Sequence, residues 1–259
     1  PMVHWPEVMM VYDEKSKALF SSDAFGCFGA LSGNIFADEL NYECEWYPES
    51  RRYYANIVGK FGLQVLNILK KLADLDIELI CSLHGPIYRR KEDILACFKK
   101  YQTWGSYSPE DDEVVIFSGS VYGHTEEFST LLATLVAQRG IRNTKVLDIS
   151  SIDVSYLLSE AFRAKVLVFA SSSYNGGLFT PMENFLMDLV AHNFQNRDVF
   201  VVENGSWALT AGKSMREIIG QLKKVNIAEE TISIKSLLTE DQYADTVAMA
   251  DKIVECLKK

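Results

Sequence analysis

Apolar runs alternate with amphipathic helical patterns along the whole second half of the chain. The runs are EVVIF from Glu113, TKVLDI from Thr144, AKVLVFA from Ala164, RDVFVVEN from Arg197 and ETISIKSL from Glu230. A helical pattern follows each run, over residues 126–140, 154–163, 180–192, 211–224 and 240–259. Strands that alternate with helices in this way form a parallel sheet with helices on both faces. The sequence therefore predicts a doubly wound α/β domain with a five-stranded parallel sheet.

Three of the five predicted strands are followed by loops rich in Gly, Ser and Asn. SGSVYGHTEE follows the first strand, SSSYNGGLFTP the third and ENGSWALTAGK the fourth, whereas the second ends in the plain LDISSID. In doubly wound sheets, ligands bind beyond the carboxyl ends of the strands, where the strand order reverses. Loops after strands one, three and four fit the order 2-1-3-4-5, whose switch point lies between strands one and three.

The first of these loops has the features of an anion site, although it contains no Lys or Arg. Its hydroxyl and amide groups run into the start of a helix, where N–H groups attract anions. It has neither the G-K-[ST] of a triphosphate loop nor the G-x-G-x-x-G of a dinucleotide site, so it suits a monophosphate such as that of FMN. Tyr174 and Trp207 on the other two loops are candidates to cover a flat ring system.

Any one of these loops, taken alone, would be interpreted as a tight turn, and their three matching positions favour a flavin site instead. The predicted FMN contacts are Ser118, Ser120, Tyr122, Gly123, His124, Thr125, Ser173, Tyr174, Asn175, Gly176, Gly177, Asn204, Gly205, Ser206 and Trp207.

The first half of the chain is less regular. Its patterns predict a hairpin (EVMMVY-DEKSK-ALFSSD), a helix with its apolar face at Val65, Ile68, Leu69 and Leu72, a strand (IELICSL) and a closing helix (KEDILACFKKYQTW). These elements do not complete a sheet, so residues 1–104 are expected to be the tail of a larger α/β domain. The small, polar and acidic residues 105–112 are the predicted linker to residues 113–259.

Three potential metal ligands stand beside the predicted strands of this first half. His4 precedes the hairpin, Asp23 leaves its second strand, and His84 follows IELICSL. Loop residues at these places can lie together at one edge of a sheet. Two imidazoles and one carboxylate suit non-haem iron, and the carboxylate is able to bridge two metal ions. Taken alone, Asp23 and His84 are equally ordinary turn residues.

Charge and cysteine usage exclude several classes of function. The net charge is −9, with 35 acidic and 26 basic residues and no basic block, which argues against nucleic acid or an anionic membrane surface as a partner. No apolar run is long enough to span a bilayer. The five cysteines are scattered and never spaced C-x-x-C, which indicates reduced thiols in a cytoplasmic protein and no rubredoxin-type iron module.

The second half resembles flavodoxin, and the whole chain resembles the flavodiiron proteins (A-type flavoproteins). In that family a metallo-β-lactamase-like domain with two irons precedes a flavodoxin-like domain with FMN. The stretches that carry the resemblance are, in order, PMVHWPE…MVY…LFSSDAFG, YYANI, SLHGPIYR and SVYGHTEE. The resemblance implies the C-terminal part of a metallo-β-lactamase-like αββα domain, followed by a flavodoxin-like doubly wound sheet. It also implies that His4, Asp23 and His84 are iron ligands.

The family's leading metal cluster, H-x-E-x-D-H, is absent from the sequence. The chain is therefore expected to be an N-terminally truncated member of the family, with an incomplete site for two iron ions. Three ligands alone are expected to hold iron poorly.

The resemblance further implies an oxidoreductase that reduces dioxygen to water, nitric oxide to nitrous oxide, or both. Electrons would pass from a rubredoxin-like or flavin-reductase donor through FMN to the diiron site, in a head-to-tail homodimer. Two alternatives stay open. One is an FMN-binding electron-transfer protein with a non-catalytic N-terminal half, and the other is a metallo-β-lactamase-type hydrolase with an accessory flavin domain.

Overall fold

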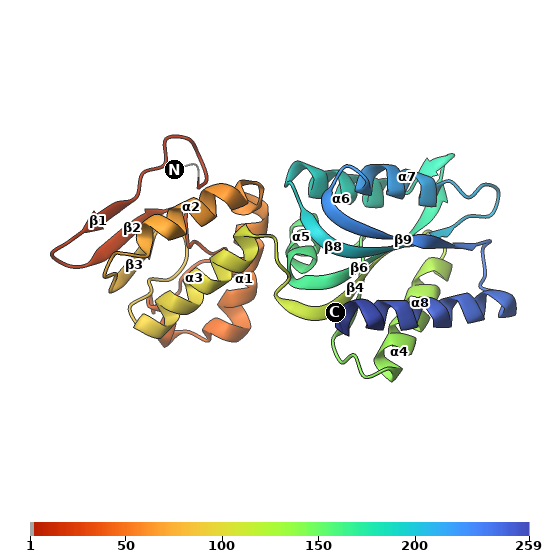
Figure 1. Ribbon diagram of the computed structural model, residues 1–259, viewed down its shortest axis with the longest axis horizontal. Helices are drawn as coiled ribbons and strands as arrows, with labels where there is room; N and C mark the ends of the chain where they lie inside the picture. Colours follow the sequence, from red (N-terminus) through yellow and green to blue (C-terminus); the bar gives the residue numbers. More distant parts are fainter. Residues whose placement is uncertain (1–2, 259) are drawn as a thin grey trace. The chain divides into compact units, whose positions relative to one another are not determined.

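The chain forms two compact units whose boundary falls between Ser108 and Pro109. The structure is a computed structural model that describes residues 3–258, and Figure 1 follows the chain through both units. No helix within residues 3–258 is both long enough and apolar enough to cross a membrane.

The first unit contains a small sheet and several short helices. Its strands β1 (Val11–Asp13), β2 (Ala18–Ser22) and β3 (Leu79–Ser82) lie in the order β1-β2-β3. The β1–β2 pair is an antiparallel hairpin, and β3 runs parallel to β2. The helical segments are η1 (Ala37–Glu39), η2 (Tyr42–Trp46), α1 (Tyr47–Tyr53), η3 (Tyr54–Val58), η4 (Gly59–Phe61), α2 (Gly62–Leu72) and α3 (Lys91–Gly105). The predicted hairpin, helix, strand and closing helix are confirmed, whereas η1 to η4 and α1 were not predicted.

An aromatic cluster and a close helix contact hold the first unit together. Tyr54 packs edge-on against Tyr101 and contacts Trp104, each with ring centroids 5.0 Å apart, and all three rings are buried. Gly62 and Gly105 lie where α2 and α3 touch, since a Cβ atom on Gly62 would overlap the Gly105 carbonyl oxygen. The helices therefore pack closely only because both positions lack a side chain.

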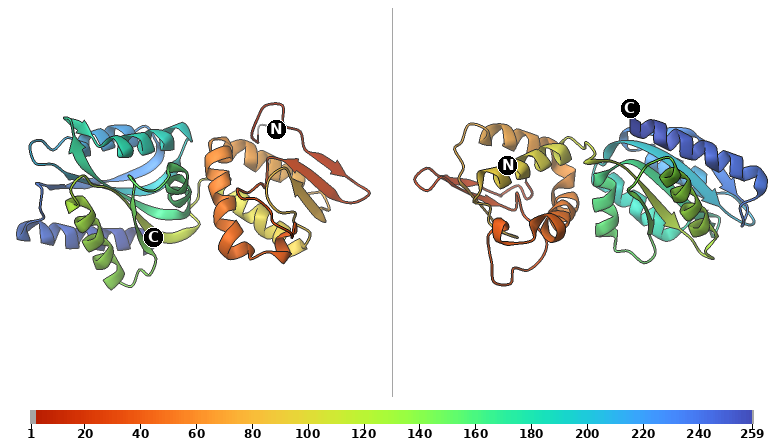
Figure 2. Two further views of the ribbon diagram at one scale, coloured as in Figure 1. Left: turned by 180° about the vertical axis from the view of Figure 1, so that it is seen from behind. Right: turned by 90° about the horizontal axis from the view of Figure 1, so that it is seen from below.

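One face of the three-stranded sheet is apolar and open. Leu19 and Ile80 point into the core, whereas Val11 and Phe20 are directly paired across β1 and β2 and are about half exposed. The hairpin extends beyond the helices of its unit (Figure 2). An open apolar sheet face is typical of a sheet that another layer covers, as in a sandwich. This is the surface that the C-terminal part of a larger layered domain presents.

The second unit is a doubly wound sheet. Its parallel strands are β4 (Asp111–Gly119), β5 (Thr144–Asp148), β6 (Ala164–Tyr174), β8 (Gln195–Asn204) and β9 (Lys223–Ile234), in the order β5-β4-β6-β8-β9. Its helices are α4 (His124–Gln138), α5 (Val154–Arg163), α6 (Thr180–Ala191), α7 (Ala211–Ile219) and α8 (Glu240–Lys258). The predicted order 2-1-3-4-5 is confirmed.

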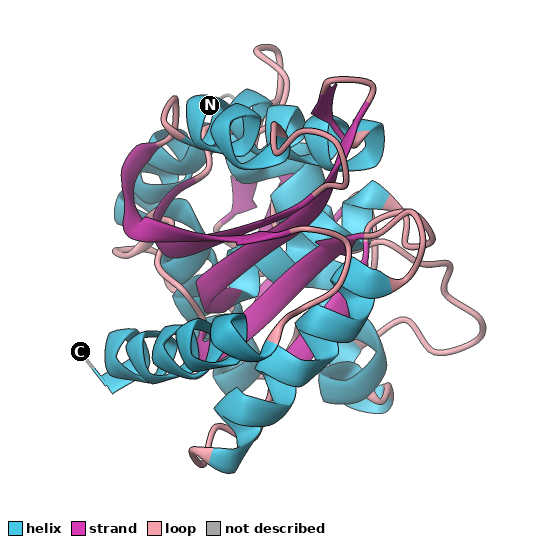
Figure 3. Cartoon of the chain, turned by 90° about the vertical axis from the view of Figure 1, so that its right-hand side faces the viewer, coloured by secondary structure: helices cyan, strands magenta, loops and turns pink. Residues whose placement is uncertain are grey.

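Helices cover both faces of this sheet (Figure 3). Alternate strand residues point to opposite faces, so Ile116 and Val168 pack in a buried cluster with residues of α4 and α8. On the other face, the rings of Phe117 and Phe169 contact Phe185 of α6. Because both faces are buried, the central strands are almost entirely apolar.

Two boundaries in the second unit differ from the prediction, and one strand was not predicted. The first strand begins at Asp111, inside the predicted linker. Helix α7 ends at Ile219 instead of residue 224, because the chain pairs with β8 as strand β9 from Lys223. The sheet also gains a short antiparallel strand, β7 (Gly177–Leu178), on β6. Asn175 and Gly176 both have positive φ, as a two-residue hairpin turn requires.

Arg197 is a buried cation near the amino ends of strands β6 and β8. Its guanidinium donates to the carbonyl oxygens of Phe162 and Ala164 at 2.7 Å and to that of Asn196 at 2.8 Å. Phe162 lies in the last turn of α5, whose carbonyl groups lack partners within the helix. Arg197 thus satisfies buried acceptors from three segments at once.

We expect the Arg197→Leu variant to lose about 2–4 kcal/mol of unfolding free energy, because it leaves these buried carbonyl groups unpaired. The matched control, Arg142→Leu, changes an exposed arginine of the same unit and should stay within about 0.5 kcal/mol of the parent. Urea unfolding followed by circular dichroism measures both. Equal midpoints for the two variants would contradict this role for Arg197.

Candidate functional site

Parallel pairing of β2 and β3 brings the first group of predicted residues together. Ser22 and Ser82 are register partners at the carboxyl ends of the two strands, so Asp23 and the loop that carries His84 emerge side by side. His84 Nε2 lies 3.5 Å from Asp23 Oδ1. His4 Nδ1 lies 3.2 Å from the other oxygen, Asp23 Oδ2. The structure therefore places Asp23 between the two imidazoles.

Backbone contacts hold the His84 loop in place. The amide of Leu83 donates to the Ser22 carbonyl oxygen at 2.9 Å, and the amide of Cys27 donates to the His84 carbonyl oxygen at 3.2 Å. Gly85 has φ +87°, and a Cβ atom there would lie 2.6 Å from the Cβ of Cys27. The turn after His84 therefore requires glycine on both conformational and steric grounds.

These three side chains open onto a cavity of about 600 Å³. Its walls include Phe28, Leu31, Ile57, Tyr53 and Cys27. Burial, reinforced by the nearby Asp23 carboxylate, raises the pKa of the Tyr53 phenol above its usual range. Burial also raises the pKa of the Cys27 thiol to about 12. At neutral pH the cavity therefore combines one carboxylate and two imidazoles with a neutral phenol, a neutral thiol and apolar walls.

Sequence analysis did not single out Tyr53 or Cys27 as site residues. Tyr53 lies in the stretch YYANI, which carried part of the family resemblance, so a signal was present. Cys27 gave no signal, because its role depends on contacts with His84 and Trp46, which are distant in sequence.

The potential metal ligands of this cavity do not form a site for a single ion. Among residues 3–258, no group of three or more His, Cys, Asp or Glu side chains is close enough to hold a single ion. The reason is that His4 and His84 face different oxygens of Asp23. Such an arrangement fits a carboxylate that bridges two ions, with one imidazole for each. It supplies only part of the ligands that such a pair needs.

The second group of predicted residues lies at the carboxyl edge of the second unit's sheet. Gly123, with φ +92°, turns the chain into α4, and its amide donates to Ser120 Oγ at 2.9 Å. Tyr122 is almost fully exposed at the tip of this loop. His124 lies at the start of α4, with Nδ1 3.4 Å from the Glu127 carboxylate. The first N–H groups of α4 thus face this loop without helical acceptors.

Two hydroxyl groups of this loop region are used inside the fold. Ser118 is buried and accepts a hydrogen bond from Ser129 of α4 at 3.1 Å. Thr125 is also buried, and its hydroxyl lies 3.1 Å from Ser172 Oγ on β6. Ser118 and Thr125 therefore fix α4 to the sheet. Ser172, which sequence analysis missed, joins the first loop to the third strand.

The loops after the third and fourth strands are tied together by Ser173. Its hydroxyl oxygen accepts hydrogen bonds from the amides of Thr210 at 3.0 Å and Ala211 at 3.2 Å, at the start of α7. The Thr210 hydroxyl in turn donates to the Gly177 carbonyl oxygen at 2.9 Å. Tyr174 is about half exposed and packs edge-on against Phe179.

Asn204 joins the fourth loop to the segment after β9. Its amide nitrogen donates to the Ser236 carbonyl oxygen at 3.1 Å, and its carbonyl oxygen accepts from the Ser236 amide at 3.0 Å. Ser206 and Ser236 place their hydroxyls 3.0 Å apart. Gly205 fits tightly, since a Cβ atom there would lie 2.5 Å from the Ala208 carbonyl oxygen. The next residue, Trp207, is fully exposed.

The predicted flavin residues thus divide into two kinds. The side chains of Ser118, Thr125, Ser173 and Asn204 brace the loops from within. The aromatic side chains of Tyr122, Tyr174 and Trp207 are presented outward at the same edge.

Comparison with known proteins agrees with this architecture. The sequence matches no family model. It is 28% identical to a protein of Methanocaldococcus jannaschii described as uncharacterized, over 91% of this chain and 58% of that protein. It is 29% identical to an anaerobic nitric oxide reductase flavorubredoxin of Aeromonas hydrophila, over 82% of this chain and 42% of that protein. The chain thus spans about half the length of these curated relatives.

Solved structures of flavodiiron proteins superimpose on the whole chain. Rubredoxin oxygen:oxidoreductase from Desulfovibrio gigas aligns with a TM-score of 0.91 at 26% identity, covering 100% of this chain and 64% of that one. The flavodiiron protein of Giardia intestinalis has the same fold, with a TM-score of 0.90 at 23% identity and the same coverage of both chains. The chain is therefore a homologue of the flavodiiron proteins, with a flavodoxin-like unit preceded by the C-terminal part of a metallo-β-lactamase-like domain.

Proposed function

We propose that this chain forms part of a flavodiiron oxidoreductase that reduces dioxygen to water or nitric oxide to nitrous oxide. The observation that carries the proposal is Asp23, which offers one carboxylate oxygen to each of two imidazoles at a cavity. The same chain carries a flavodoxin-like edge. When bound, FMN would supply one-electron transfer, and an iron pair would bind and activate the diatomic molecule.

The flavin edge is suited to a monophosphate and a flat ring. The loop of residues 120–125 would hold the phosphate through amide groups at the start of α4, where the helix dipole favours an anion. Tyr174 and Trp207 would lie against the ring, and their exposure leaves them open to such contact. Gly205 and Gly177 would let the backbone approach the ring closely.

The cavity of the first unit is suited to two iron ions and a small substrate. Asp23 would bridge the ions, with His4 on one side and His84 on the other. The neutral Tyr53 phenol can donate a hydrogen bond at the cavity wall. Phe28, Leu31 and Ile57 keep the wall apolar, which suits an uncharged diatomic molecule.

Electron supply and assembly complete the proposal. Flavorubredoxin and rubredoxin oxygen:oxidoreductase are the names of two of the compared proteins, and these names support a rubredoxin-like donor. A flavin reductase is the alternative donor. A head-to-tail homodimer would bring the flavin edge of one copy to the metal cavity of the other.

A second candidate is an FMN-binding electron carrier whose first unit is structural. This candidate is favoured by the small number of donors, because no group of three or more potential ligands is close enough to hold an ion within the described residues, and His4, Asp23 and His84 supply only part of the ligands that two ions need. Metal content separates the two candidates, because only the first requires iron at Asp23.

We expect FMN to bind at least about tenfold more tightly than riboflavin, because charge-assisted hydrogen bonds to the phosphate contribute about 1.5–3 kcal/mol each. The Gly123→Ala variant should bind FMN more weakly than the parent and bind riboflavin equally well, since φ +92° strains any residue with a side chain. Quenching of flavin fluorescence measures both affinities. Equal affinities of the parent chain for FMN and riboflavin would contradict a phosphate site at this loop.

The Gly205→Ala variant should bind both FMN and riboflavin about tenfold or more weakly, because its methyl group displaces the loop that carries Trp207. Gly140→Ala is the control, because Gly140 (φ +92°) follows α4, outside the predicted flavin loops, and a Cβ atom there would meet no atom within 4 Å. If Gly205→Ala left riboflavin binding at the level of this control, the ring would not lie against the fourth loop.

We expect the parent chain to bind ferrous iron weakly through its three ligands, and the Asp23→Asn variant to bind it at least about tenfold more weakly. The amide preserves the size of the side chain but lacks the charge that attracts the cations. His192→Ala, at the end of α6, is the control and should bind iron as the parent does. Anaerobic equilibrium dialysis against ferrous iron measures the three affinities. Equal iron affinities of the parent chain and the Asp23→Asn variant would favour the electron carrier instead.

A further inference from the structure

Residues 28–35 form an irregular segment that is flanked at both ends by hydrogen bonds to residues 84–87. At its start, the Cys27 amide donates to the His84 carbonyl oxygen at 3.2 Å. At its end, the Ile87 amide donates to the Ile35 carbonyl oxygen at 2.8 Å, and the Ala37 amide donates to the Ile87 carbonyl oxygen at 2.9 Å. We call residues 28–35 the strap. Both of its ends are attached to the short segment that carries His84.

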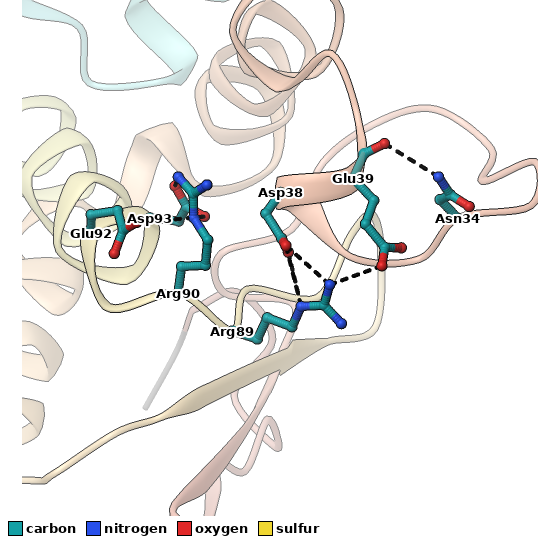
Figure 4. A network of polar contacts seen from close by, with 7 residues as sticks. All are labelled: Asn34, Asp38, Glu39, Arg89, Arg90, Glu92 and Asp93. Carbon is teal, nitrogen blue, oxygen red and sulfur yellow. Dashed lines mark hydrogen bonds and ion pairs between the residues drawn. The ribbon is translucent and has the colours of Figure 1, made fainter.

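Arg89 binds the residues that directly follow the strap (Figure 4). Arg89 Nε and Nη2 donate to the two carboxylate oxygens of Asp38, each at 3.0 Å, and Nη2 also donates to Glu39 Oε1 at 2.8 Å. The guanidinium carbon lies 3.9 Å from the centre of the Phe36 ring. Hydrogen bonding to Arg89 lowers the pKa of Asp38, which keeps this carboxyl group ionised. We call Arg89, Asp38, Glu39 and Phe36 the clamp.

Only an arginine side chain can make this set of contacts. Its planar fork matches a carboxylate with two parallel hydrogen bonds, and its flat face packs on an aromatic ring. The Asn34 side chain, near the end of the strap, donates to the Glu39 carbonyl oxygen at 3.3 Å. The clamp therefore connects the end of the strap to η1 and to the segment after His84.

The strap forms one wall of the cavity that contains Asp23. Phe28, Gly29 and Leu31 line this cavity, while most other strap residues are exposed. The strap contains no helix or strand, and Gly29 and Gly33 both have positive φ. Segments with few buried contacts open at low free-energy cost. The position of this wall therefore depends on the attachments at its two ends.

We propose that the strap controls access to the cavity and that Arg89 is the positioning residue that keeps it closed. The inference deepens the proposed function, on which it rests for the identity of the substrate. The closed strap covers the side of the cavity that Phe28 and Leu31 line, whereas His84 at the same cavity is about half exposed. An open strap would let larger molecules reach the covered side, while the ligand side chains stay in place.

Cys27 provides a reporter that needs neither metal nor flavin. Its thiol lies in the cavity wall at the start of the strap and is buried. Cys97 is buried in α3 and does not line the cavity, and Cys44 is exposed. Cys27, Cys44, Cys81 and Cys97 are free thiols, so alkylation followed by peptide mass spectrometry reports on each of these positions separately.

We expect the Arg89→Gln variant of the full chain to react with iodoacetamide at Cys27 about tenfold faster than the parent, because its strap opens more often. Cys97 should react at the parent's rate. The reaction rate of Cys27 with a bulky fluorescein maleimide should rise by a larger factor than its rate with iodoacetamide, since the closed strap excludes the larger reagent more strongly. The Cys27 rate of Arg89→Lys should lie between those of the parent and Arg89→Gln, because an ammonium group keeps the charge but lacks the planar guanidinium that binds a carboxylate through two hydrogen bonds.

Arg90→Gln is the matched control. Arg90 neighbours Arg89, but it pairs with Glu92 and Asp93 at the start of α3 (Figure 4). This variant should leave Cys27 at the parent's rate.

Two results would overturn the inference: equal Cys27 rates in Arg89→Gln and Arg90→Gln, or a parallel rise at Cys27 and Cys97, which would mean that the whole unit loosens. Because the assay uses the chain without iron or FMN, its outcome is independent of whether the proposed reaction occurs.

Discussion

Parallel strand pairing places the functional side chains of both units. A parallel pair brings two carboxyl ends to the same edge, so residues far apart in the sequence emerge next to each other. In the first unit, the Ser22–Ser82 pairing sets Asp23 beside His84. In the second, Ser118 pairs with Ala170 and Ser172 with Asn204, so the three flavin loops leave the sheet at one edge. Each site depends on this register, because a shifted strand would move its loop away.

Polar side chains then fix the loops that the strands bring together. Ser173 caps the start of α7, and Asn204 binds both backbone groups of Ser236. Arg89 does the same in the first unit by joining η1 to the segment after His84. These contacts let exposed loops keep a defined shape with little apolar burial of their own. The residues that we propose as ligand contacts are those that lie outward on the braced loops, such as Trp207, or at a cavity, such as Asp23.

Much of this arrangement could be predicted from the sequence. Alternating apolar runs predicted the parallel sheet of the second unit, and the loops after its first, third and fourth strands predicted the strand order. The positions of Asp23 and His84 after strands predicted that they would meet. The end of α7 was missed, because Lys223 pairs with Gln195 and tertiary pairing overrides the helical pattern there. The bracing role of Asn204 was also missed, because its partner Ser236 becomes a neighbour only when β9 joins the sheet. The clamp at Arg89 gave no local signal, since Asp38 lies fifty-one residues away.

The central claim is that Asp23 bridges two metal positions, with His4 at one and His84 at the other. The most direct measurement is an anomalous difference map at the iron absorption edge, from crystals grown anaerobically with ferrous iron. The account predicts two peaks, one between Asp23 and His4 and one between Asp23 and His84. A single peak shared by all three side chains, or no peak at Asp23, would contradict it.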